Sequence, residues 1–96
     1  MNLDEVVRSL DELPREAIFY IPRECNPSLV SPETPVLLVT ADEAQPEGWR
    51  YFLEVIIARE VLEVWSSWRD GRVPSPEEAL SAIAYYAEND AYRPDE

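Results

Sequence analysis

Proline and glycine divide this chain into short segments, and these segments limit the structures that it can form. Pro14 ends a first helical pattern, because proline lacks the amide hydrogen that a helix interior needs. Residues 22–34 hold three prolines and predict a loop that is long for a compact domain, so they are a candidate binding loop. Gly48 and Gly71 stand before and after the next long apolar segment.

The chain has enough apolar residues for one hydrophobic core. A chain of this length buries roughly 60–68% of the surface that its unfolded form exposes. Its hydrophobic fraction of 46% is normal for a folded protein, whereas a disordered chain combines low hydrophobicity with high charge. We therefore expect one small acidic domain over residues 1–96, with a polar tail at 91–96.

The first helix is predicted by apolar residues at helical spacing and by a capping pattern. The apolar positions that repeat every three or four residues are Leu3, Val6, Val7, Leu10 and Leu13. Asn2 and Glu5 are spaced to form a capping box, in which each side chain bonds the backbone amide of the other residue. We expect a helix over about residues 3–12.

Three apolar segments favour β-strands. Residues 17–21 are short and β-favouring, and proline follows them. Residues 35–40 hold an unbroken apolar run, which predicts a strand buried on both faces. Residues 49–55 are ambiguous, because Leu53 also belongs to a helical stripe that continues toward the C-terminus. We prefer a strand followed by a helix over 55–70, since Tyr-Phe-Leu favours a strand.

The last helix has the clearest start. Ser75 and Glu78 predict a second capping box, and Pro76 suits the first turn. Gly71 is well placed to cap the preceding helix at its C-terminal end. The predicted order is α-β-β-β-α-α, and its simplest arrangement is an α+β fold with a three-stranded antiparallel sheet and about three helices.

The residue types that most enzymes use are missing. Histidine is absent, which removes the commonest general base and the commonest zinc ligand. The chain has two glycines and therefore no glycine-rich phosphate loop. The single cysteine, Cys25, cannot form an intramolecular disulfide and is interpreted as an incidental loop thiol. We expect a protein that is not an enzyme, with no catalytic residue, no metal site and no cofactor.

Charge is the outlying feature of the composition. Twenty acidic residues face eight basic ones, all arginine, and the net charge is −12 at pH 7. Such a charge repels nucleic acid and anionic lipid, and it attracts basic surfaces. No signal peptide is visible, and the longest apolar run is too short to span a bilayer. We expect a cytoplasmic protein with a basic protein partner and no direct nucleic-acid or membrane partner.

Two acidic regions and two aromatic residues form the predicted contact surface. The regions are the loop at 41–48 and the end of the last helix, and aromatic side chains are frequent interface anchors. Trp65 and Trp68 share an inner helical stripe, so we expect them in the core rather than at an interface. The predicted partner-binding residues are Asp42, Glu43, Glu47, Trp49, Glu88, Asp90 and Tyr92.

The C-terminal half resembles a known family pattern. It contains Pro74-Ser75-Pro76-Glu77-Glu78-Ala79-Leu80, followed by Tyr85-Tyr86-Ala87-Glu88-Asn89-Asp90-Ala91-Tyr92. A capped helix with paired tyrosines that ends in Asn-Asp-Ala-aromatic is similar to the signature of a family of small, acidic bacterial proteins of uncharacterised function. The size and charge are also similar to those of immunity proteins, which neutralise bacterial toxins, and this comparison is an analogy.

These features lead to two main hypotheses. The first is an immunity or inhibitor protein that neutralises a basic toxin domain, such as a nuclease, by occluding its site. The alternative is a generic interaction or adaptor module, monomeric or homodimeric, in which the charge serves only solubility. A third class, a carboxylate enzyme, would need a deep pocket with two facing acids.

Overall fold

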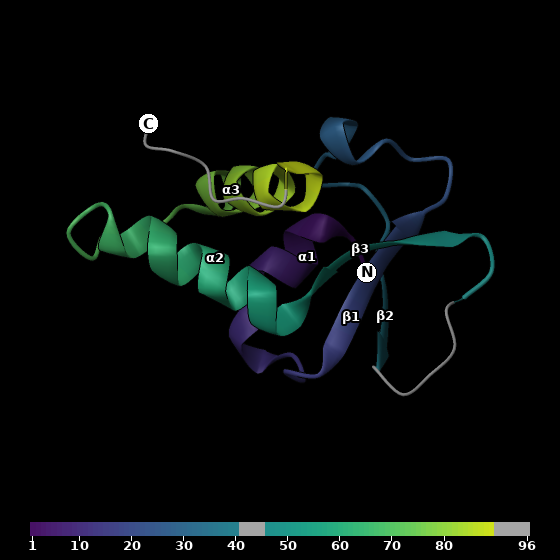
Figure 1. Cartoon of the computed structure of the whole chain (residues 1–96), viewed down its shortest axis with the longest axis horizontal. Coiled ribbons are helices and arrows are strands. Elements are labelled where there is room, and N and C mark those ends of the chain that lie inside the picture. Colours follow the sequence, from purple (N-terminus) through teal and green to yellow (C-terminus); the bar gives the residue numbers. More distant parts are fainter. Residues whose placement is uncertain (41–45, 90–96) are drawn as a thin grey trace.

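The computed structural model describes residues 1–40 and 46–89. One antiparallel sheet carries α-helices and short 3₁₀-helices, the latter labelled η (Figure 1). The element order is α1 (Leu3–Arg8), η1 (Leu10–Glu12), β1 (Ala17–Pro22), η2 (Pro27–Leu29), β2 (Leu37–Thr40), β3 (Trp49–Glu54), α2 (Val55–Ser67) and α3 (Pro76–Asn89). The predicted α+β fold and the order α-β-β-β-α-α are confirmed.

β1 is the central strand, in the order β2-β1-β3. Phe19 pairs with Leu53 of β3, and the next residue of β1, Tyr20, pairs with Tyr51, so Phe52 is an extra residue in β3. This β-bulge allows the neighbours Phe52 and Leu53 both to be buried, which a regular strand would not do. The Phe52 ring packs against Phe19 with the ring centroids 6.0 Å apart.

β2 differs from its prediction. Its three apolar residues, Leu37 to Val39, are half-buried and Thr40 is exposed, so the prediction of a strand buried on both faces is wrong. In the described part of the chain, β2 is an edge strand that pairs with β1. An apolar run indicates a strand, but the position of that strand in a sheet depends on partners far away in the sequence.

The first helix is shorter than predicted. The capping box of Asn2 and Glu5 is confirmed, but α1 ends at Arg8 rather than near residue 12. The Ser9 hydroxyl donates a hydrogen bond to the Glu5 carbonyl oxygen at 2.6 Å, and the chain then tightens into η1. This turn keeps Leu10 in the core, where its side chain is buried.

The strand-then-helix prediction for residues 49–70 is confirmed, with one correction at the helix end. α2 stops at Ser67, so Trp68 becomes its C-cap and is 53% exposed, and its predicted place in the core is wrong. Trp65 is buried as predicted. Gly71 has a φ of 79° and its N–H donates to the Ser66 carbonyl, which satisfies one of the free groups at this helix end.

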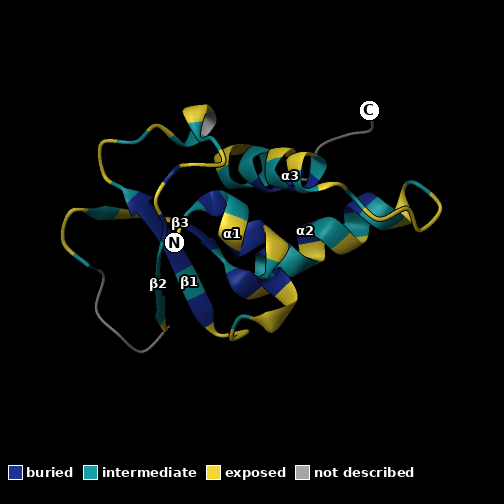
Figure 2. Cartoon of the chain, turned by 180° about the vertical axis from the view of Figure 1, so that it is seen from behind, coloured by how far each residue is buried: buried dark blue, intermediate teal, exposed yellow. Residues whose placement is uncertain are grey.

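The core lies between the sheet and the helices. α2 packs against β1 and β3, and α3 packs against α1 and α2. Figure 2 shows buried residues along β1 and on the inward sides of the helices. The largest side chains with no more than minimal exposure are Phe19, Leu3, Ile21, Ile83, Val6 and Val55.

Arg59 of α2 holds the end of η1. Its Nε and Nη2 donate to the Leu10 carbonyl oxygen at 3.2 and 3.1 Å, and Nη2 also donates to the Leu13 carbonyl oxygen at 2.6 Å. The guanidinium fork satisfies the Leu13 carbonyl at the end of η1 and gives a further donor to the Leu10 carbonyl, which also accepts the Leu13 amide at 3.3 Å. This contact joins residues that are more than 40 positions apart in the chain.

We expect Arg59→Lys to lower the free energy of unfolding by about 1–2 kcal/mol, because one ammonium group cannot replace the guanidinium fork. Chemical denaturation measures the change. Arg23→Lys is the control, since the exposed Arg23 side chain makes no hydrogen bond or ion pair with the described residues. Equal stability of the two variants would contradict this role of Arg59.

Candidate functional site

The predicted contact residues do not form one surface in the structure, because those near β3 lie apart from the one on α3. Trp49 is the first residue of β3 and is half-buried, and Glu47 is exposed in the turn just before this strand. Glu88 is exposed in the last turn of α3. Figures 1 and 2 place the start of β3 at one end of the molecule, away from α3. The remaining predicted residues lie outside the described part of the chain, namely Asp42, Glu43, Asp90 and Tyr92.

Glu88 lines a groove between α3 and the segment 27–32. Both cartoon views place η2 beside the C-terminal part of α3 (Figures 1 and 2). The groove has a volume of about 530 Å³, within the range of ligand-binding clefts. We call it the α3 groove, and its lining residues are Pro27, Val30, Pro32, Glu77, Leu80, Ser81, Ala84, Tyr85 and Glu88.

The α3 groove has acidic ends and an apolar middle. Glu77 lies in the first turn of α3 and Glu88 in the last, and both are exposed. Eleven residues complete about three helical turns, so the two glutamates lie on the same side of α3 and about 16 Å apart. Leu80 and Ala84 are half-buried between them. Both charged lining residues are glutamates, so the groove suits a basic ligand with apolar parts.

Backbone hydrogen bonds attach the other wall of the groove to α1. The amides of Leu3 and Asp4 donate to the carbonyl oxygens of Thr34 and Pro32, at 2.9 and 3.0 Å. These amides belong to the first turn of α1 and have no partner within the helix. The Thr34 side chain is buried and accepts a hydrogen bond from the Ser31 amide. The segment that sequence analysis proposed as a binding loop is therefore anchored at its C-terminal side.

Sequence analysis predicted Glu88 as a contact residue and residues 22–34 as a candidate binding loop, and it missed the other α3 residues of this groove. It did not include the paired tyrosines among the predicted contact residues. The structure packs Tyr86 against the core, whereas Tyr85 lines the α3 groove. Glu77 was likewise not among the predicted contact residues. The spacing of Glu77, Ser81, Ala84 and Glu88, which puts them on one face, was the available signal.

The start of α3 is held by a second capping box, as predicted. The Glu78 amide donates to the Ser75 Oγ at 3.1 Å, and the Ser75 amide donates to the Glu78 Oε1 at 3.0 Å. The Arg72 guanidinium contacts the Glu78 Oε2 at 2.6 Å. The hydrogen bond from the Ser75 amide lowers the pKa of Glu78 from its ordinary value, partial desolvation opposes this shift, and the charge of Arg72 adds to it.

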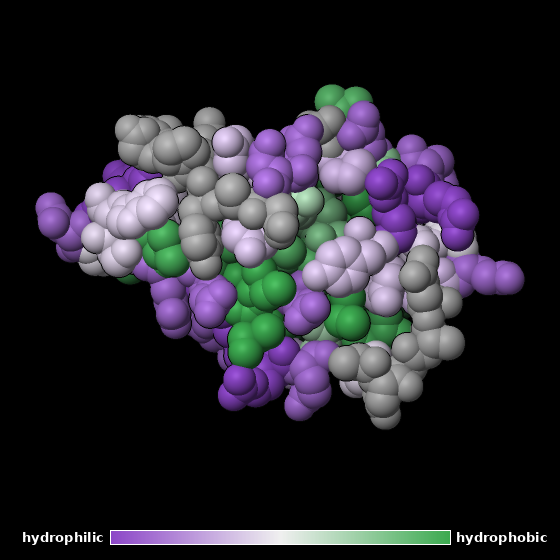
Figure 3. Space-filling view, in the orientation of Figure 1, coloured by the Kyte–Doolittle hydropathy of each residue, from purple (hydrophilic) through white to green (hydrophobic). Residues whose placement is uncertain are grey.

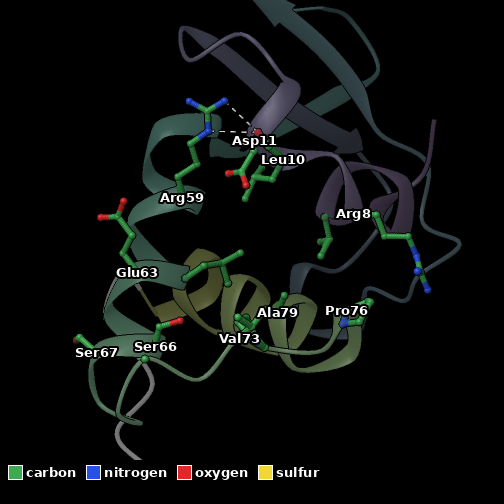
Figure 4. Close-up of a pocket in the computed structure, with 14 residues that line it drawn as sticks. Arg8, Leu10, Asp11, Arg59, Glu63, Ser66, Ser67, Val73, Pro76 and Ala79 are labelled. Carbon is green, nitrogen blue, oxygen red and sulfur yellow. Dashed lines mark hydrogen bonds between the residues drawn. The ribbon is translucent and has the colours of Figure 1, made fainter.

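A larger hollow lies between α1, η1, α2 and the start of α3 (Figure 4). Its volume is about 800 Å³, and its charged lining residues have mixed signs. Figure 4 shows Arg59 directed at Leu10, while Glu63 points outward from α2. Glu63 and Asp11 thus do not face each other across the hollow, which is the arrangement that a carboxylate enzyme would need.

We also searched the described residues for groups of metal-ligating side chains and for helices that could span a membrane. Within 1–40 and 46–89, no group of three or more Cys, Asp or Glu residues lies together as a metal site would require. No helix in these ranges is long and apolar enough to cross a bilayer. Cys25 is half-buried and packs against the core.

Comparisons with family models, with curated proteins and with solved structures found no match to this chain. The resemblance of the C-terminal half to small acidic bacterial proteins therefore remains a prediction. The α3 groove is consequently interpreted from its own chemistry.

The lowered pKa of Glu78 predicts an acid-dependent stability. A carboxyl group whose pKa is lowered by folding stabilises the protein above its unfolded pKa, and this contribution is lost as the pH falls through the folded pKa. We expect Glu78→Gln to show a smaller decrease in Tm than the unsubstituted protein between about pH 7 and about pH 3. Thermal denaturation followed by circular dichroism measures both decreases.

Glu60→Gln is the matched control for this experiment. Glu60 is an exposed residue of α2, and its side chain makes no hydrogen bond or ion pair with the described residues. Its variant should show the same decrease in Tm as the unsubstituted protein. If Glu78→Gln also shows that decrease, the assigned role of Glu78 is wrong.

Proposed function

We propose that this protein is an immunity or inhibitor protein that binds a basic toxin domain, such as a nuclease, and occludes its site. The proposed contact surface is centred on the α3 groove. Glu77 and Glu88 are the charged residues of this surface within the described part of the chain. The proposed partner is a protein with a basic surface that needs to be covered to block its activity.

The observation that carries this proposal is that the arginines do not neutralise the acidic surface. Within the described residues, two ion pairs are present, Arg8 with Asp4 and Arg72 with Glu78. Other arginines donate to backbone carbonyls, and these are Arg50, Arg59 and Arg69. Most acidic side chains in this part of the chain are therefore left to act on a partner.

An unneutralised acidic surface has a defined effect on binding. It raises the rate of encounter with a basic protein and opposes encounter with acidic ones. Close contact then requires apolar area that loses water, which the middle of the α3 groove offers through Val30, Leu80 and Ala84. A standard interface buries roughly 800 Å² on each partner, so the contact would extend beyond the groove.

A second candidate function is an adaptor module that forms a homodimer. It is favoured by exposed apolar residues away from the α3 groove, including Ile56, Trp68 and Val73. Figure 3 shows a hydrophobic patch over the first part of α2. A dimer built on α2 would cover this patch, and the charge would then serve solubility.

The proposal is tested by identifying the partner and measuring its association kinetics. The tagged protein would be used to isolate the partner from the native organism, and co-expression would test whether it relieves the toxicity of that partner. We expect a basic partner whose association rate falls at least about tenfold as salt rises from about 0.05 to about 0.5 M, because salt screens the attraction.

Paired variants locate the binding surface. Glu77→Gln with Glu88→Gln should slow association more than Glu12→Gln with Glu60→Gln, although both pairs remove the same charge. Glu12 and Glu60 are exposed residues of η1 and α2. A partner with no basic surface, or an association rate independent of salt, would overturn the proposal. A stable homodimer in light scattering without any other partner would favour the adaptor instead.

A further inference from the structure

We infer that the α3 groove binds an extended segment of the partner with the pattern basic-x-apolar-x-basic. This inference rests on the proposed function, and it adds the chemistry and the spacing of the segment that enters the groove. The occupant is a protein segment that contributes three side chains to one face. The two outer side chains pair with Glu77 and Glu88, and the central side chain covers the apolar middle.

The positions of the charges set the spacing of the ligand. The two glutamates are about 16 Å apart along α3, since eleven residues rise 1.5 Å each. In an extended chain, residues i, i+2 and i+4 lie on the same face, and the outer two are about 13 Å apart. Arginine and lysine side chains are long enough to cover the remaining few ångströms. Two basic residues at i and i+4 therefore match Glu77 and Glu88.

The middle of the groove selects an apolar side chain at i+2. Leu80 and Ala84 of α3 and Val30 of the opposite wall are half-buried, so an aliphatic side chain placed between them would lose more water from both surfaces. The segment 27–32, which forms the other wall, is already held in place before binding. This raises the affinity, because no free energy is lost in ordering a loop when the ligand binds. The apolar residue thus provides affinity that a purely basic segment lacks.

One end of the groove favours arginine over lysine. Tyr85 lines the groove and lies three residues before Glu88, a separation that makes side chains neighbours on a helix surface. A guanidinium group can pair with a carboxylate and stack on an aromatic ring, whereas an ammonium group is a compact point charge. We expect the basic residue that meets Glu88 to be arginine.

Peptide titrations of the full chain, followed by ¹⁵N–¹H correlation spectra, test the inference. The probe is a capped peptide containing Arg-Ser-Leu-Ser-Arg, and the control contains Arg-Arg-Ser-Ser-Leu, which has the same composition and charge. We expect saturable shift changes at the amides of residues 28–31 and along α3 with the probe. The control, or a probe with serine in place of leucine, should bind about threefold to tenfold more weakly.

Matched variants test whether peptide binding depends on the glutamates of the groove or only on the total negative charge of the protein. Glu77→Gln with Glu88→Gln should weaken probe binding several-fold more than Glu12→Gln with Glu60→Gln does. Equal binding of the probe and the scrambled peptide, with shifts spread over the acidic surface, would overturn the inferred sequence pattern of the bound segment. The proposal that the partner is basic would still stand. An absence of saturable shifts at the groove would also overturn it. Groove binding of the probe combined with a non-basic natural partner would instead overturn the proposed function.

Discussion

The structure depends on the packing of helices against β1, the central strand of the sheet. β1 is paired with a neighbour on each edge, and its residues Phe19 and Ile21 are fully buried. α2 packs against this strand, and Arg59 links α2 to the end of η1 through backbone carbonyls. α3 then packs on α1 and α2, and the segment 27–32 bonds to the start of α1. Both walls of the α3 groove are thus positioned by the same core.

The contacts of the arginines leave most of the acidic side chains without a basic partner. Three arginines hold backbone carbonyls and two form ion pairs, so most acids in the described part of the chain stay unpaired. Unpaired like charges destabilise a folded protein through repulsion, and binding to a basic surface relieves that repulsion. We therefore connect the destabilising charge to the proposed function, in which the same acids direct the approach of a partner.

Sequence analysis succeeded where structure depends on near neighbours. Both capping boxes, Asn2 with Glu5 and Ser75 with Glu78, involve residues three positions apart, and both were predicted. It failed where distant parts of the chain decide the outcome. The edge position of β2 and the exposure of Trp68 depend on which elements pack beside them. The α3 groove was likewise hidden, because one wall comes from a loop about fifty residues before α3.

A crystal structure of this protein bound to its natural partner would show whether the α3 groove is the contact surface. We expect arginine or lysine nitrogens of the partner within about 4 Å of the carboxylates of Glu77 and Glu88, the distance of an ion pair. It also predicts an apolar side chain of the partner between them, against Leu80 and Ala84. A partner bound to α2 near Ile56 and Trp68, with nothing bound in the α3 groove, would show that the groove is not the binding site.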